Sequence, residues 1–461
     1  MHEWTEQTEQ LAAAVLAYTQ DRLRLRPVPL DGPRTPEELS AEAGATITAE
    51  GIGGEEALRI FADVLAPACI SIDHPRYFSF VPCAPTPAST LFDLVVGASS
   101  IYGGSWMEGA GAVHAENEAL RWLADLAGFP PGAGGVFVQG GTLANVSALI
   151  AARHAAARAG EGEPREVSRE GRRFAVAASA EAHSSVTSAA SAMDVDLIGV
   201  EPDDSGRLTG VALSEALDRS AAEHPERVPF AVVATAGTTN LGIVDDLAGV
   251  AEVARSRALW LHVDGAYGAA ALAAPSRRHL FDGIESADSF VVDPHKWLFA
   301  PFDCAALVYR DPELGRQAHR QHAAYLEPLR TGDEWSPSDY ALHLTRRARG
   351  LPFWFSLASY GSDAYSQAVE RTLQVADHAA AQVRRSPHLE LVSDPMLSVV
   401  AFYRTGWSDG QYYDWSSRML TSGTAFVVPT THHGRTAIRL CIVNPRSTEE
   451  DIDTVLESLA D

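Results

Sequence analysis

The chain has 461 residues, 46% of them hydrophobic and 21% charged, and its 60 acidic against 36 basic residues give a formal net charge of −24. A chain of this length buries a substantial core and exceeds one ordinary domain, so we expect two or three domains. The negative charge repels nucleic acids and anionic membranes and argues against both as partners. The four cysteines are far apart, and no stretch has the pattern of an export signal or a membrane span. We therefore expect a cytoplasmic protein without disulfides or a bound metal.

Apolar residues at helical spacing predict an N-terminal helix over residues 5–24, and a proline-rich extended arm follows as far as Pro33. Between about residues 85 and 310, short β-branched runs alternate with alanine-rich helical segments. These runs are GVFVQ, FAVAAS, FAVVAT, WLHVD and FVVDP. The alternation predicts parallel strands joined by helical crossovers.

Two segments predict connections. Residues 165–173 (REVSREGRR) are highly charged and predict a solvated surface loop. Residues 311–345 contain Pro, Gly and Asp without clear periodicity and predict a long connection, of the kind that often carries function. A helix over about residues 353–385, a few strands and a closing helix from Thr448 complete the predicted order.

Lys296 is the only lysine in the chain, and it comes just after the apolar run FVVDP, with His295 between them. Apolar surroundings lower the pKa of an ammonium group because burial disfavours the charged form, and the neutral amine is the form that attacks an aldehyde. Lys296 is therefore a candidate covalent catalyst. The alternatives are a surface lysine at a strand end, or one lysine left by a strong arginine bias.

Two further segments place polar or small residues at the ends of predicted strands. LHVDGAYG ends at Asp264, whose carboxylate could keep a pyridine nitrogen protonated, with Ala266 as a flat floor. GVFVQGGTLAN combines a strand, a tight turn at Gly141 and Thr142, and a helix whose N-terminus could bind a phosphate with help from Asn145. Alternatively, the aspartate caps a helix or forms an ion pair, and the turn merely starts a helix.

A histidine and a pair of threonines are further candidates for binding a ligand, because they too lie next to predicted helices or strand ends. His183 precedes a helix rich in small residues in SAEAHSSVTSAAS, where its ring could stack on a flat cofactor or serve structure alone. Thr238 and Thr239 lie at a strand end in VVATAGTTN, where their hydroxyls could bond a ligand or stabilise a β-turn.

The order of these motifs resembles the group II pyridoxal-phosphate decarboxylases, typified by aromatic-L-amino-acid decarboxylase. The resemblance covers roughly residues 5–461. It also rests on HPRYFSF near residue 74, the SW pair at 105, AHSSV at 182, GTT at 237, HVDGAYG at 262, RHLFDGIESADSF at 278, PHKW with FDC at 294 and RRARGLPFWF at 346.

The resemblance implies the α/β fold of the aspartate-aminotransferase-like (fold type I) enzymes. This fold has a mostly parallel central sheet with helices on both faces and a small C-terminal α+β domain. We accordingly expect an N-terminal helical segment over residues 1–84, a large cofactor-binding domain over 85–345 and a small domain over 346–461. The resemblance also implies a homodimer with active sites at the subunit interface.

The resemblance further implies pyridoxal 5'-phosphate as the cofactor, held as an imine on Lys296, and an L-amino acid as the substrate. It makes Asp264 the partner of the pyridine nitrogen and His183 the ring-stacking residue. The other predicted cofactor contacts are Gly141, Thr142, Asn145, Thr239, Ala266, Asp293 and His295.

The implied reaction is decarboxylation to the amine and CO2, after which the Cα atom must be protonated. In the family this proton is linked to a tyrosine on a loop between the lysine and the RR pair. This chain departs from that pattern, because Pro337 stands near the expected position, Tyr340 lies three residues later and Tyr325 well before. Tyr340 and His183 are the candidate proton donors. Oxidative deamination to an aldehyde is the alternative activity, and a transaminase or a catalytically silent scaffold are further alternatives.

The segment HPRYFSFVPCAP resembles the substrate-pocket segment of the family. Apolar walls there favour an aromatic or bulky aliphatic side chain over glutamate. Tyr102 and Gly104 are predicted to reach the pocket of the partner subunit, and Arg439 is predicted either to bind the substrate carboxylate or to be structural. The predicted wall residues are Phe80, Val81, Pro82 and Cys83.

Overall fold

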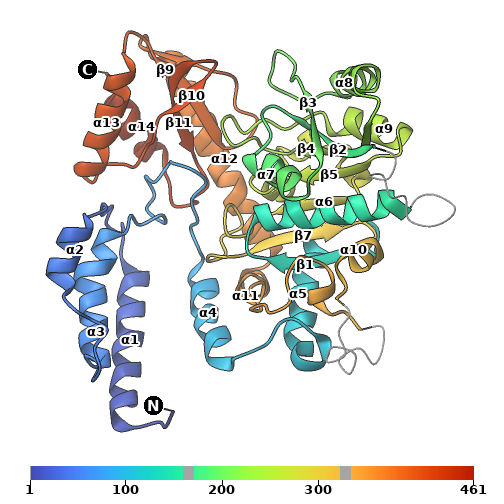
Figure 1. The fold of residues 1–461 in the computed structure, drawn as a ribbon. Coiled ribbons are helices and arrows are strands. Elements are labelled where there is room, and N and C mark those ends of the chain that lie inside the picture. The colour runs from blue at the N-terminus through green and yellow to red at the C-terminus, as the bar shows by residue number, and fades with distance from the viewer. Residues whose placement is uncertain (1, 159–170, 322–333, 461) are drawn as a thin grey trace.

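The computed structural model describes residues 2–158, 171–321 and 334–460 (Figure 1). The N-terminal helices lie side by side, apart from the large sheet. Helix α1 (Glu6–Arg24) begins where Thr5 accepts a hydrogen bond from the backbone of Thr8, and none of its residues is buried. The helix predicted over residues 5–24 is thus confirmed. The arm continues through α2 (Pro36–Ala43), α3 (Gly54–Ile60), η1 (Phe61–Leu65) and η2 (Ala66–Ala68).

A seven-stranded sheet forms the centre of the molecule, in the order β1-β7-β6-β5-β4-β2-β3. Strands β2 to β6 pair in parallel, and β7 is antiparallel to both of its neighbours, so the predicted mostly parallel sheet is confirmed. The strands are β1 (Gly134–Val138), β2 (Arg173–Ser179), β3 (Asp196–Val200), β4 (Arg227–Thr235), β5 (Trp260–Asp264), β6 (Ser289–Val292) and β7 (Ala305–Tyr309). The sequence patterns predicted five of them and missed β3 and β7.

Helices cover both faces of this sheet, because alternate strand residues point to opposite sides. On β4, Val232 and Ala234 belong to the core shared with α5 (Trp106–Leu126), α8 (Gly210–Glu223) and α9 (Leu247–Ser256). Ala231 and Val233 belong to the opposite core, with α6 (Gly141–Arg158) and α7 (Ser184–Ala192). The remaining elements of this part are α4 (Pro87–Ser99), η4 (Gly268–Ala273), η5 (Arg278–Phe281), η6 (Ile284–Ser286), α10 (Pro312–His319) and η8 (Pro337–Asp339).

A four-stranded antiparallel sheet of order β10-β11-β9-β8 forms the C-terminal part. The predicted single helix over residues 353–385 is wrong in one respect: Gly361, at φ 81°, separates two helices. The first helix packs against α4 and α5 of the central part. The elements are α11 (Leu351–Tyr360), α12 (Ser362–Arg385), β8 (Leu389–Leu391), β9 (Val399–Arg404), α13 (Asp409–Thr421), β10 (Thr430–His432), β11 (Arg435–Cys441) and α14 (Glu449–Glu457). The domain boundaries at residues 84 and 345 remain predictions.

Most of the loop predicted at residues 165–173, and much of the connection predicted at 311–345, including Tyr325, lie outside the described residues. The described part of that connection begins with helix α10 and ends with the short turn η8. Within the described residues, no helix combines the length and the apolar character needed to cross a membrane.

A buried ion pair fixes the end of this connection to the sheet. The two guanidinium nitrogens of Arg346 contact the two carboxylate oxygens of Glu116 at 2.7 and 2.9 Å, and both side chains are almost fully buried. The backbone N–H of Gly350 also donates to Glu116, at 2.8 Å. One carboxylate thus holds the turn that leads into α11.

Replacing Glu116 by glutamine should lower the free energy of unfolding by about 3 kcal/mol, because it leaves the Arg346 guanidinium buried without a counter-charge. Urea unfolding followed by circular dichroism measures the change. Glu313→Gln, at the half-exposed pair with Arg316, is the matched control and should change stability by less than about 0.5 kcal/mol. Equal losses in the two variants would contradict the assigned role of the buried pair.

Candidate active site

A cavity of about 500 Å³ lies at the carboxyl ends of the parallel strands. β4 ends at Thr235 and β5 at Asp264, while Asp293 follows β6 directly, so parallel pairing brings these three side chains to one edge of the sheet. Such edges are where open α/β sheets bind ligands. Every residue predicted to bind the cofactor lines this cavity: Gly141, Thr142, Asn145, His183, Thr239, Asp264, Ala266, Asp293, His295 and Lys296.

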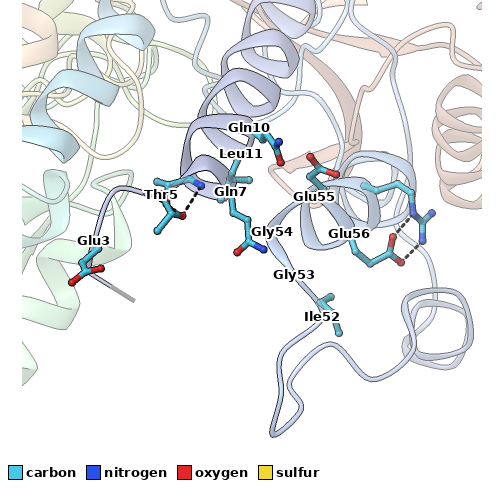
Figure 2. A pocket seen from close by; sticks show the side chains of 12 residues that line it. Glu3, Thr5, Gln7, Gln10, Leu11, Ile52, Gly53, Gly54, Glu55 and Glu56 are labelled. Carbon is cyan, nitrogen blue, oxygen red and sulfur yellow. Dashed lines mark hydrogen bonds and ion pairs between the residues drawn. The ribbon is translucent and has the colours of Figure 1, made fainter.

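Another hollow, of about 850 Å³, lies on the N-terminal arm between the starts of α1 and α3 (Figure 2). Most of its lining residues are polar, and its Arg59 guanidinium is paired with Glu56 at 2.6 Å. It contains none of the predicted site residues, so the cavity at the strand ends is the candidate active site.

The amine of Lys296 lies 2.9 Å from Oδ2 of Asp293, in a turn that directly follows β6. Burial lowers the pKa of Lys296, but the hydrogen bond and charge of Asp293 and the charge of Asp264 outweigh it, so the net shift is upward. The expectation of a lowered pKa in this pocket is therefore wrong. The sequence pattern showed the apolar neighbours of Lys296, but it did not show that the Asp293 carboxylate contacts the amine.

The carboxylate of Asp264 is held on both oxygens. Oδ1 accepts a hydrogen bond from the backbone N–H of Ala266 at 3.1 Å, and Oδ2 accepts one from the amide of Asn145 at 2.8 Å. Asn145 was expected to assist at a phosphate. In the structure, its amide nitrogen instead donates to Asp264 and to the hydroxyl of Ser185, the latter at 2.9 Å.

The turn at Gly140 and Gly141 starts helix α6 beside the cavity. Gly141 N–H donates to Asp293 at 3.3 Å, and a Cβ atom on Gly141 would lie 3.0 Å from Ala266 and 3.1 Å from Asp293. Only glycine therefore fits here without displacing its neighbours. His183 also lines the cavity, as the N-cap of α7, where its Nδ1 accepts from the backbone of Ser185 at 3.2 Å.

Two buried polar atoms in this cavity lack a hydrogen-bond partner among the described residues, the hydroxyl of Thr235 and Oδ1 of Asp293. Buried polar groups are normally paired, so their presence fits a polar ligand in the cavity. Together with the amine, the carboxylates and the start of α6, they fit a phosphorylated, aldehyde-bearing cofactor. Thr235 was not predicted, although its place at the end of FAVVAT was a usable signal. The other lining residues that were not predicted as contacts are Gln139, Gly140, Gly237, Tyr267, Phe302 and Asp303.

Only two of the residues predicted to contact the substrate line the cavity. Phe80 and Val81 line the cavity. Pro82 and Cys83 do not, because the chain turns into the core, where the Cys83 thiol donates to the carbonyl of Ala300 at 2.7 Å. Their prediction as cavity walls is wrong for this chain. Arg439 lies behind the wall and donates to the backbone carbonyls of Thr239, at 2.9 Å, and Phe80, at 2.7 Å.

Tyr340 also lies away from the cavity, which corrects its prediction as a proton donor. It is 5% exposed in the core beside α6, its ring stacks on Trp335 with centroids 4.0 Å apart, and burial raises its pKa. The hydroxyl of Tyr102 donates to the carbonyl of Leu344 at 3.0 Å, away from this cavity. The predicted contacts of Tyr102 and Gly104 with a partner subunit remain predictions.

Comparisons with known proteins agree with this geometry. Residues 41–405 match the model of the pyridoxal-dependent decarboxylase conserved domain. An aromatic-L-amino-acid decarboxylase of Bacillus atrophaeus is 29% identical over 83% of this chain and 79% of its own length. An L-2,4-diaminobutyrate decarboxylase of Rhizobium meliloti (strain 1021) is 31% identical over 85% and 78%. A crystal structure of Oryza sativa TDC with PLP and tryptamine covers 100% of this chain and 98% of that one at a TM-score of 0.90 and 24% identity, which shows a shared fold.

The fold is therefore the aspartate-aminotransferase-like (fold type I) fold, with the small C-terminal sheet appended to the large mixed one. The matched family model spans most of the chain, including the cavity and Lys296. The chain belongs to the pyridoxal-dependent decarboxylases and is an amino-acid carboxy-lyase whose cofactor is pyridoxal 5'-phosphate.

Proposed function

We propose that this enzyme decarboxylates an L-amino acid with an aromatic or bulky apolar side chain. The observation that carries the proposal is the single cavity that holds Lys296, Asp264 and His183 together with apolar walls, including Phe80 and Phe302. A cationic substrate side chain would need an unpaired carboxylate. Asp293 is paired with Lys296 and Asp303 with Arg349, which favours an apolar side chain.

When bound, pyridoxal phosphate supplies an aldehyde that condenses with amines and a ring that accepts the electron pair of the broken bond between Cα and the carboxylate. Lys296 is the amine that holds it, oriented by Asp293 at 2.9 Å. The Asp264 carboxylate would keep a proton on the ring nitrogen. The Thr142 amide, at the positive end of α6, would bind the phosphate, while the Gly141 amide donates to Asp293 and its lack of a side chain leaves room beside the phosphate.

His183 is the candidate that remains for protonating Cα, because it lines the cavity and Tyr340 does not. Its imidazole also fits the ring-stacking role, since it lines the same cavity as Asp264 and Lys296. Arg439 contributes indirectly, by holding the backbone of Phe80 and Thr239 in place. The apolar walls keep water from the reacting atoms, which strengthens every electrostatic contact inside.

We also propose that the protein is a homodimer in the cytoplasm. Helix α1 buries no residue in one chain, and α4 exposes apolar residues at helical spacing, Leu91, Leu94 and Val95. Contiguous exposed apolar residues mark interaction surfaces, and a second copy would cover both helices. The four cysteines are free thiols, which suits a reducing compartment.

The test of the activity is incubation of the holoenzyme with a panel of L-amino acids. We expect CO2 and the matching amine from aromatic or bulky aliphatic substrates, at higher kcat/KM than from glutamate or 2,4-diaminobutyrate. Aldehyde with ammonia and peroxide would instead establish an aldehyde synthase. Turnover that depends on a keto acid would establish a transaminase, and no turnover of any substrate would support a silent scaffold.

Borohydride reduction of the holoenzyme should attach the cofactor to one peptide, the one containing Lys296, because the chain has no other lysine. Lys296→Arg keeps a positive charge but removes the nucleophilic amine, so it should lose the covalent label and at least about 1,000-fold in kcat. Mass spectrometry locates the label. Arg277→Lys, at a surface pair with Asp377, is the control because it adds a lysine outside the cavity. In this variant Lys296 should carry the label and the added lysine should not. A label in Lys296→Arg would refute the assignment.

Leu94→Arg on α4 should weaken the proposed dimer, because it places a charge in an apolar interface. Sedimentation velocity should give about twice the mass of the 49.3 kDa chain for the wild type and a shift toward one chain for the variant. Leu197→Arg, at an exposed leucine on β3, is the control and should sediment like the wild type. A monomeric wild type would remove the dimer proposal.

A further inference from the structure

A chain of buried hydrogen bonds runs behind the cavity, from the sheet to Asn145. The indole N–H of Trp260 lies 2.9 Å from the hydroxyl of Ser289. That hydroxyl lies 2.8 Å from Nδ1 of His262, and Nε2 of His262 lies 2.9 Å from Oδ1 of Asn145. All four side chains are buried, so water does not compete for these bonds.

From Asn145 the chain divides toward two predicted site residues. The amide nitrogen reaches Asp264 at 2.8 Å and the hydroxyl of Ser185 at 2.9 Å. The Ser185 hydroxyl in turn lies 2.8 Å from Nδ1 of His183. One amide group therefore connects the carboxylate at the end of β5 with the imidazole at the start of α7.

The chemistry of the partners assigns every donor on the first half of this chain. An indole N–H only donates, so the Ser289 oxygen accepts from Trp260. The Asp264 carboxylate only accepts, so the nitrogen of Asn145 faces it and the oxygen of Asn145 faces His262. Nε2 of His262 therefore carries a proton. Burial lowers the pKa of His262 to about 4, which leaves the ring neutral at pH 7 and its Nδ1 free to accept from Ser289.

The second half assigns the tautomer of His183. The backbone N–H of Ser185 donates to Nδ1 of His183 at 3.2 Å, so this nitrogen is an acceptor. The Ser185 oxygen accepts from Asn145 and turns its own hydrogen toward the same Nδ1. The proton of the neutral imidazole is consequently on Nε2.

We propose that Asn145 is a positioning residue that couples Asp264 to His183 through an amide held in one orientation by His262. The coupling keeps the Asp264 carboxylate as an acceptor for the ring nitrogen and His183 as a donor at Nε2. It rests on the proposed function for its catalytic meaning, but the tautomer and the contacts are properties of this chain by itself. None of the sequence motifs assigned this role to Asn145, Ser185 or His262.

The tautomer is measured directly by NMR of the full-length protein labelled with 15N-histidine, without substrate. The resonances of His183 are identified by their loss in His183→Gln. We expect the wild type to show a protonated Nε2 and an unprotonated Nδ1 at neutral pH. Ser185→Ala removes the hydroxyl that points to Nδ1, and Asn145→Leu removes the amide that orients it. Only the longer backbone contact of Ser185, at 3.2 Å, then holds Nδ1 as an acceptor, so both variants should show more of the second tautomer. An unchanged tautomer in both variants would overturn the coupling.

Kinetics separate the two branches. Asn145→Leu removes a hydrogen bond to a charged group and should lower kcat by about 10- to 100-fold, with a shifted absorption band of the bound cofactor. Ser185→Ala leaves the contact of Asn145 with Asp264 intact, so it should lower kcat without shifting that band. Asn444→Leu removes another buried asparagine, which contacts Asp73 instead of the cavity, and is the matched control for loss of packing. Its kcat and absorption band should match the wild type, and similar effects in the two asparagine variants would overturn the proposal.

The role of His262 is tested by a pair of substitutions. His262→Gln can still donate to the oxygen of Asn145 and should retain most of the wild-type rate and the wild-type tautomer of His183. His262→Leu cannot donate and should resemble Asn145→Leu. Thermal unfolding of each variant shows whether it is folded, and equal losses for Gln and Leu would remove His262 from the chain of positioning contacts.

These outcomes are distinguishable from failure of the proposed function. A protein that shows the predicted tautomer changes but decarboxylates no amino acid would retain the coupling and lose the proposed activity. A protein that decarboxylates normally, with the His183 tautomer and kcat of Asn145→Leu unchanged, would retain the activity and lose the coupling.

Discussion

Parallel pairing of β4, β5 and β6 is the constraint on which the site depends. The register places Thr235 beside Asp264 and Asp264 beside Val291, so the strands reach the same edge together. Side chains far apart in the sequence therefore meet at one cavity, without a long loop to carry any of them. The antiparallel strand β7 lies between β6 and β1, and the chain enters it at Ala305, soon after the turn that carries Lys296.

The site concentrates charge on buried carboxylates, and the protein gives each of these charges a specific partner. Lys296 has Asp293, and Asp264 has an amide and a backbone N–H. Unpaired, either group would be costly to bury. The same rule operates away from the cavity, where Glu116 neutralises Arg346 and holds the entry to α11.

One chain leaves part of its apolar surface uncovered near the cavity and on the arm. Phe80 is 63% exposed and Phe302 55%, although both line the cavity, and α1 has no buried residue. An enzyme that must keep water from its reacting atoms gains from covering such residues, and a second copy of the chain provides that cover in the proposed assembly. The polar hollow on the arm, by contrast, has its own internal ion pair.

Sequence alone determined the parts of this protein that follow from local chemistry and periodicity. The single lysine after an apolar run, the strand-end Asp264, the glycine turn and the histidine before a helix were all identifiable, because each has a characteristic residue type at a characteristic place. The alternation of strands and helices predicted the mostly parallel sheet, although β3 and β7 were missed.

Tertiary structure decided which side chains face one another. The family resemblance suggested that Cys83 lines the cavity with Val81 and that Tyr340 reaches it, yet both are packed in the core. The raised pKa of Lys296 depends on the direction of the Asp293 side chain, and the part played by Asn145 depends on contacts with residues 40 and 119 positions away. Periodicity gives the face on which a side chain lies, but a hydrogen bond also requires the position and orientation of its partner, which only the folded chain supplies.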